Sequence, residues 1–141
     1  MGIINPYLNF DGKCREAMNF YKDSFGGELV LQTIKGSKVE KQCSAAIQHH
    51  ILHATLTNDA MILMGSDMKG TEDLIKGNTI ALSLNCNSKQ EIENYFLKLS
   101  IGGKVFHALK HEASGETFGV ITDKYGIRWM LNYDSHKSVI N

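Results

Sequence analysis

The feature that most limits the possible folds of this chain is an internal repeat. When the 141-residue sequence is compared with itself at an offset of 76 positions, Leu8 aligns with Leu84 and Phe20 aligns with Phe96. At this offset residues 3–30 contain nine identities in 28 positions, whereas random matching at average composition gives about two. A repeat of this length predicts two similar structural units in one chain.

Each copy begins with a predicted strand, which is followed by a predicted helix. Residues 4–10 alternate between apolar and polar side chains, and a period of two predicts a strand. Residues 13–25 place apolar side chains at helical spacing. In the second copy residues 79–85 alternate in the same way, and Ser88 with Glu91 three positions later predicts a capping box at a helix start. A pair of glycines closes each predicted helix.

Three further strand-like segments follow each predicted helix. They are residues 28–35, 51–57 and 60–65 in the first copy, and 104–111, 117–122 and 127–133 in the second. Residues 36–48 are expected to form a mobile loop or irregular hairpin, and residues 67–78 the link between the halves. The predicted fold is α+β, with tandem β-α-β-β-β modules at about 3–66 and 78–133 in a single domain over 1–141.

Charge and cysteine content exclude several classes of function. Fifteen Lys and Arg balance fifteen Asp and Glu, so no net field draws the chain toward nucleic acid or an anionic membrane. The apolar runs are far shorter than the roughly 20 residues that span a bilayer, and the N-terminus carries no secretion signal. Cys14, Cys43 and Cys86 are odd in number and widely spaced, as expected of reduced thiols. We therefore expect a cytoplasmic protein with no nucleic-acid or membrane partner.

Several strings in the chain resemble one known family. They are Pro-Tyr-Leu-Asn-Phe-Asp-Gly at 6–12, Glu-Ala-Met-Asn-Phe-Tyr at 16–21, Phe-Gly-Gly at 25–27, His-Ala-Thr-Leu at 53–56, Gly-Ser-Asp at 65–67, and Phe-Gly-Val-Ile-Thr-Asp-Lys-Tyr-Gly-Ile-Arg-Trp-Met at 118–130. With the tandem repeat, they resemble the PhnB-like branch of the vicinal-oxygen-chelate superfamily, which includes glyoxalases, extradiol dioxygenases and bleomycin-resistance proteins. The resemblance implies a glyoxalase-like curled mixed sheet around a central cavity, in a homodimer.

The same resemblance implies where a metal would bind. The four positions that carry metal ligands in the superfamily's metal enzymes fall on Asn5, Leu63, Thr79 and Met130. Ni, Zn or Fe sites need imidazole, carboxylate or thiolate donors, which these side chains do not provide. The histidine clusters lie in strand-like runs, where four residues span about 13 Å, too far for one ion to bridge. We expect neither a metal nor another cofactor.

The expected site therefore consists of residues that line a metal-free cavity. Strand alternation directs Asn5, Tyr7 and Asn9 away from the helix, and Arg128 with Met130 would share the cavity face. No catalytic residue is assigned. The residues expected to line the cavity or contact a ligand are Asn5, Tyr7, Asn9, His53, Leu63, Thr79, Arg128 and Met130.

Two of these residues keep alternative interpretations. His53 is a motif residue of the resembled family, so it either contacts a ligand or a subunit partner, or it is a half-buried histidine bonded to backbone. Arg128 either receives an anionic group through its planar guanidinium or pairs with Asp123 or Glu116 at the surface. Trp129 has the opposite parity to Arg128, which predicts that it packs under a helix.

Three functions stay open at this point. The first is sequestration of a small organic molecule without a metal. The second is an enzyme: a lyase, a dioxygenase, a ubiquinone-pathway methyltransferase as some relatives are labelled, or an acid–base enzyme using His53, Asp67 or Glu116. The third is a structural or regulatory homodimer, because half-barrels have open strand edges to cover.

Overall fold

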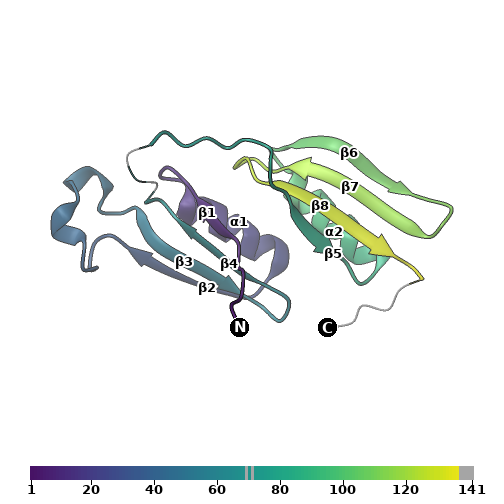
Figure 1. The fold of residues 1–141 in the computed structure, drawn as a ribbon, viewed down its shortest axis with the longest axis horizontal. Helices are drawn as coiled ribbons and strands as arrows, with labels where there is room; N and C mark the ends of the chain where they lie inside the picture. The colour runs from purple at the N-terminus through teal and green to yellow at the C-terminus, as the bar shows by residue number, and fades with distance from the viewer. Residues whose placement is uncertain (69, 71, 137–141) are drawn as a thin grey trace. The chain divides into compact units, whose positions relative to one another are not determined.

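The computed structural model describes residues 1–68, 70 and 72–136, and the chain divides into two compact units, Met1–Ile75 and Lys76–Asn141. Lys69 and Thr71, which belong to the expected link, lie outside the described residues. Each unit contains one strand, one helix and then three strands (Figure 1). The predicted tandem β-α-β-β-β organisation and the α+β fold class are therefore confirmed.

The first unit is a four-stranded mixed sheet with one helix against it. Its elements are β1 (Tyr7–Asn9), α1 (Cys14–Phe25), β2 (Glu28–Thr33), β3 (Ile51–Thr57) and β4 (Ile62–Ser66). The strand order is β1-β4-β3-β2, in which β1 and β4 are parallel and the other pairs are antiparallel. Helix α1 buries Ala17, Met18 and Tyr21 against Ala54 and Leu56 of β3, and these side chains form the core of the unit.

The second unit repeats this topology. Its elements are β5 (Leu82–Asn85), α2 (Lys89–Ser100), β6 (Lys104–His111), β7 (Glu116–Thr122) and β8 (Arg128–Asp134). The strand order β5-β8-β7-β6 is that of the first unit, again with one parallel pair, β5 and β8. Ile92 and Leu99 of α2 are buried, as are Trp129 and Leu131 of β8, so Trp129 lies on the helix side as predicted.

The repeated glycine pairs have a steric reason. Gly26 and Gly102 follow the two helices with φ of +74°, a region that favours glycine. A Cβ on Gly27 would lie 2.5 Å from the Thr57 carbonyl oxygen. A Cβ on Gly103 would meet the backbone of β7 in the same way, so both units need glycine where the chain turns from helix to strand.

The segment between β2 and β3 is more ordered than a simple loop. It contains two 3-10 turns, Glu40–Gln42 and Ala45–Ile47. The Gln48 Nε2 group donates to the carbonyl oxygens of Glu40, Cys43 and Ser44 at 2.9, 3.0 and 3.3 Å. One side chain therefore ties both turns together.

The first strand of each unit is shorter than its alternation predicts. Pro6 precedes β1 and has no N–H for the ladder, although its carbonyl oxygen accepts from the Met64 N–H at 3.1 Å. Asn5 and Thr79 consequently lie before β1 and β5, not within them. Among the described residues no helix combines the length and apolarity needed to cross a membrane.

Candidate functional site

Each sheet has one face covered by its helix and one face without a helix, which we call the open face. The residues on the open face follow from the register of the strands. On the first sheet Tyr7 lies beside Met64, Met64 beside Thr55 and Thr55 beside Val30. Tyr7 is 47% exposed and Val30 is 58% exposed, so this face presents apolar surface to the surroundings.

A chain of three polar side chains crosses the first open face. The Tyr7 hydroxyl lies 3.3 Å from His53 Nδ1, and the Thr55 hydroxyl lies 3.0 Å from His53 Nε2. The Tyr7 and His53 rings also contact each other, with centroids 5.7 Å apart. His53 is therefore held by side chains from two strands, and the expected alternative of a histidine bonded to backbone is not what the structure shows.

Leu63 does not belong to this face, so that part of the prediction is wrong. Leu63 is 2% exposed and lies opposite Leu56, on the face that α1 covers. Its neighbour Met64 occupies the open face beside Tyr7, as Met130 does beside Ser83 in the second unit. The prediction was out of register by one residue, and in a strand a shift of one residue moves a side chain to the other face.

The second open face consists of three rows of side chains that run across β8, β7 and β6. The rows are Arg128–Thr122–Lys104, Met130–Val120–His107 and Asn132–Phe118–Lys110. At the end of the third row the Asn132 amide donates to the Ser83 hydroxyl at 3.2 Å. This face therefore changes from cationic, through mainly apolar, to polar along the strands.

The guanidinium of Arg128 is stacked but has no acidic partner. Its Cζ atom lies 4.4 Å from the ring centroid of Phe106, and the Lys104 ammonium lies 5.0 Å from the same centroid. The Nε atom of Arg128 is buried without a hydrogen-bond partner. Neither cation forms an ion pair with another described residue.

The two carboxylates considered as partners of Arg128 are engaged elsewhere. Asp123 is 3% exposed, and its oxygens accept hydrogen bonds from the backbone N–H groups of Tyr125 and Ile127 and from the Trp129 indole. Glu116 lies beside Asp134 at the far end of β7. The surface-pair alternative for Arg128 is therefore not observed.

The residues at the four expected metal positions do not fit a transition-metal site. Asn5 and Thr79 precede their strands, Leu63 is buried under α1, and Met130 lies on an open face. These side chains provide one amide and one hydroxyl but no imidazole, carboxylate or thiolate. Across residues 1–68, 70 and 72–136, no three His, Cys, Asp or Glu side chains are grouped so that they could hold an ion. The absence of a metal stays a prediction.

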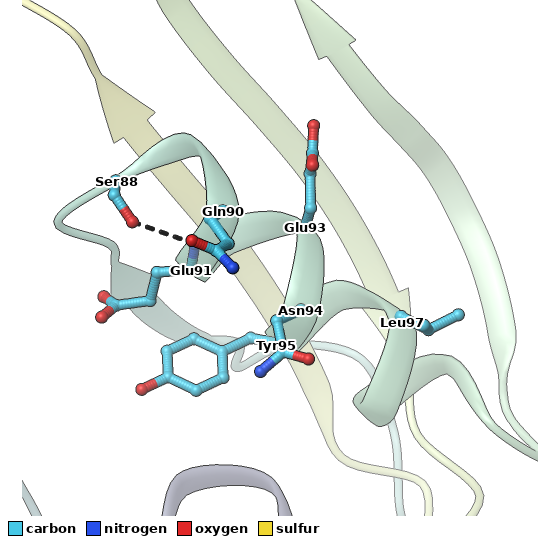
Figure 2. Close-up of a pocket in the computed structure, with 7 residues that line it drawn as sticks. All are labelled: Ser88, Gln90, Glu91, Glu93, Asn94, Tyr95 and Leu97. Carbon is cyan, nitrogen blue, oxygen red and sulfur yellow. Dashed lines mark hydrogen bonds between the residues drawn. The ribbon is translucent and has the colours of Figure 1, made fainter.

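Two surface pockets lie away from the open faces, and the sequence did not suggest either. Figure 2 shows the larger, of about 620 Å³, on the outer side of α2. It is lined by Ser88, Gln90, Glu91, Glu93, Asn94, Tyr95 and Leu97. Burial raises the pKa of the Tyr95 hydroxyl, and the nearby Glu91 carboxylate raises it further. A smaller pocket of about 410 Å³ lies at the start of α1 beside Arg15 and His49.

Sequence reasoning missed several residues of the open faces. Lys104 and Phe106 were available as an alternating pair in a strand-like run, but the register of β6 is irregular between Val105 and His107. Thr55 was quoted in a motif, yet only its contact with His53 gives it a place in the site.

Comparisons with known proteins cover nearly the whole chain. A family model described as 3-demethylubiquinone-9 3-methyltransferase matches residues 3–132. Protein PA1353 from Pseudomonas aeruginosa is 33% identical, covers 95% of this chain and 98% of its own, and superposes with a TM-score of 0.83. A putative 3-demethylubiquinone-9 3-methyltransferase, PhnB protein, from Bacillus cereus is 28% identical over 94% of this chain and 99% of its own, with a TM-score of 0.76.

Two further matches are lower in sequence identity. Protein YjdN of Escherichia coli K12 is 27% identical over 142 residues, which is 92% of this chain and 93% of that protein. A glyoxalase-related enzyme from Fulvimarina pelagi is 13% identical over 95% of this chain and 89% of its own, with a TM-score of 0.63. This last likeness concerns the fold alone.

Proposed function

Because the chain belongs to the 3-demethylubiquinone-9 3-methyltransferase-like (PhnB) family, whose glyoxalase-like fold it shares, we propose that it binds a small organic molecule on an open face of its sheets without a metal ion. The resemblance noted from the sequence strings is confirmed by these matches. Ligand identity and the absence of a metal belong to the proposal.

The observation that carries the proposal is the composition of the open faces. Tyr7, Val30 and Phe106 expose 47%, 58% and 52% of their surfaces there. The polar groups beside them are few and specific, namely the Tyr7–His53–Thr55 chain and the Arg128 guanidinium. The clefts that bind small organic ligands have a similar lining, mainly apolar with a small number of placed polar groups.

The chemistry of the expected ligand positions supports a metal-independent mode of binding. Leu63 and Met130 have no donor suited to Ni, Zn or Fe, and Leu63 is buried on the other face of its sheet. Binding would then rest on stacking, hydrogen bonds and apolar contact, with His53 as a polar contact on the first open face and Arg128 as a polar contact on the second.

Thermal unfolding in the presence of ligands tests this proposal. The protein, treated with EDTA, is heated with a panel of neutral and anionic aromatic metabolites, and at least one compound is expected to raise Tm. A ligand at 100 times its Kd stabilises the folded state by about 2.7 kcal/mol. If no compound in the panel raises Tm, the proposal is contradicted.

A second measurement tests the metal-free part separately. The protein is dialysed against Ni, Zn, Mn or Fe salts, and bound metal is counted by elemental analysis. Substoichiometric metal is expected, because the four positions lack suitable donors. If one ion per chain remains bound after a second dialysis, the metal-free part of the proposal is contradicted. Whether the protein binds a ligand is then still decided by the thermal experiment.

Methyl transfer is a second candidate because the matching family model carries that description. It requires a methyl donor, so titration with S-adenosylmethionine by calorimetry distinguishes it from simple binding. If turnover is found, His53 is the best acid–base candidate, because its ring lies on an open face whereas Asp67 is 7% exposed. His53→Gln with unchanged turnover would remove it from that role.

We also propose that the protein is a homodimer. In each unit the outer strands, β1 and β2 or β5 and β6, have one side without a neighbour in their own sheet. Such edges are commonly covered by another element or another chain. A second copy is one way to cover them.

A further inference from the structure

The second open face carries two cations close to one aromatic ring, that of Phe106. Arg128 and Lys104 belong to one row, separated by Thr122, and both lie close to the Phe106 ring. Neighbouring strands are about 4.8 Å apart, so positions two strands apart are separated by about 10 Å, close enough for long side chains to reach one group.

This pair of cations is not neutralised within the part of the chain that the structure describes. The Arg128 side chain forms no ion pair or hydrogen bond there, and its Nε atom is buried without an acceptor. Glu116 is six residues from Thr122 along β7, about 20 Å away. The terminal nitrogens of the guanidinium also make no hydrogen bond to a described residue, so an acceptor brought by a ligand would satisfy them.

The row next to Arg128 and Thr122 indicates what kind of group the ligand carries beside its acceptor. Met130 and Val120 lie side by side one row from Arg128 and Thr122, and both are partly exposed. Rows on one face are about 7 Å apart, which matches the length of a bicyclic aromatic body. Beyond them, Phe118 and Asn132 form the third row.

We infer that the ligand of this face is an organic oxyanion, whose anionic group binds Arg128 and Lys104 and whose flat apolar body lies over Val120 and Met130. The inference rests on the proposed function and names its ligand class. Carboxylate and phosphate share the required chemistry, because the guanidinium fork can donate two parallel hydrogen bonds to either. Methionine and aromatic side chains adapt well to a flat apolar group.

Three probes of one shape test the inference: 2-naphthoate, 2-naphthyl phosphate and the neutral 2-naphthamide. Calorimetric titration of the full-length protein is expected to show that at least one of the two anions binds ten-fold or more tightly than the amide. Arg128→Met is expected to remove this preference, so that the two anions bind no more tightly than the amide. Arg128→Lys keeps the charge but loses the fork, so an intermediate preference is expected. Lys104→Met is expected to weaken the phosphate more than the carboxylate.

A matched control is Lys124→Met. The Lys124 ammonium lies 5.2 Å from the Tyr125 ring, so this lysine also loses a charge and an aromatic contact on substitution, but in the turn between β7 and β8. It is expected to leave all three affinities unchanged. Circular dichroism and Tm of each variant without ligand verify that the fold is intact.

The outcomes separate this inference from the proposed function. If the wild-type protein binds the amide as tightly as both anions, the anion inference is overturned and small-molecule binding stands. If Lys124→Met loses as much anion affinity as Arg128→Met, the effect is general charge and the inference is overturned as well. If none of the three probes binds, the inference is overturned, and the thermal panel decides the proposed function independently.

Discussion

At the scale of single residues, Asp67 was a candidate acid–base residue, but in the structure its carboxylate binds backbone N–H groups. Its carboxylate accepts hydrogen bonds from the backbone N–H groups of Gly12 and Cys14 at 2.8 and 3.0 Å, and of Ile51 at 2.8 Å. It therefore joins the turn before α1, the first residue of α1 and the first residue of β3. Hydrogen bonds to a charged acceptor are among the stronger ones in proteins.

We predict that Asp67→Asn destabilises the protein by about 2–4 kcal/mol, because the amide has one acceptor oxygen and brings N–H donors toward N–H donors. Urea unfolding followed by circular dichroism measures the change. Asp59→Asn, at an exposed turn position, is the control and should stay within about 0.5 kcal/mol of wild type. Equal stability of the two variants would show that the Asp67 contacts contribute little.

The cysteines give a second prediction at this scale. Burial raises the pKa of the Cys14 thiol to about 12, with the Asp67 carboxylate adding to the shift. Burial likewise raises the pKa of the Cys86 thiol to about 12, with Glu91 adding to it. Because the thiolate is the reactive form, both thiols should be inert in the folded protein near pH 8, while the partly exposed Cys43 reacts.

Titration with Ellman's reagent at pH 8 should therefore detect one rapidly reacting thiol in the folded protein and three in urea. The same shifts predict the pH dependence of stability. The unfolded thiols ionise near their ordinary value of 9.0 and the folded ones near 12, so their contribution is complete below pH 9 and is lost as pH rises toward 12. Fast reaction of all three thiols at pH 8 in the folded state would contradict the assignment.

At the scale of elements, the two helices begin in different ways although their sequences repeat. The Ser88 hydroxyl accepts from the Glu91 N–H at 3.0 Å, and the Glu91 carboxylate accepts from the Asn87 N–H at 2.9 Å. This is the capping box that the sequence predicted. The N-cap residue of α1 is Lys13, which makes no side-chain cap, and Asp67, directly after β4, caps this helix instead.

Ser88→Ala should therefore cost about 1 kcal/mol, because it leaves the Glu91 N–H without its acceptor. Lys89→Ala, on the exposed first turn of α2, provides a matched control with little expected change. Both are read from urea unfolding. A loss in Lys89→Ala as large as that in Ser88→Ala would argue against a specific capping effect.

At the scale of the whole molecule, the proposed homodimer makes a direct prediction. Sedimentation velocity at micromolar concentration should give a species of twice the 15.7 kDa chain mass. Stability should then rise with protein concentration, because association and folding are linked. A clean monomer across that concentration range contradicts the proposal and leaves the ligand experiments unaffected.

The sequence by itself determined the two-unit plan, the α+β class, the order of the elements and the cap of α2. These features depend on local patterns: an offset repeat, periods of two and of 3.6, glycine pairs, and a serine three residues before a glutamate. The repeat is found by comparing the chain with itself, and each of the other patterns is complete within a short stretch of chain, so all of them can be read before the chain is folded.

Alternation predicts that Arg128 and Met130 share a face, but only the tertiary structure decided which strands lie side by side and which side chains meet on the open faces. Leu63 lies under α1, and Met64 occupies the open-face position that was expected for Leu63. Phe106 lies beside Arg128, and the Asp123 carboxylate accepts a hydrogen bond from the Trp129 indole. These outcomes depend on strand register, where one residue reverses a face, and on contacts between residues distant in sequence. Local periodicity carries no information about either.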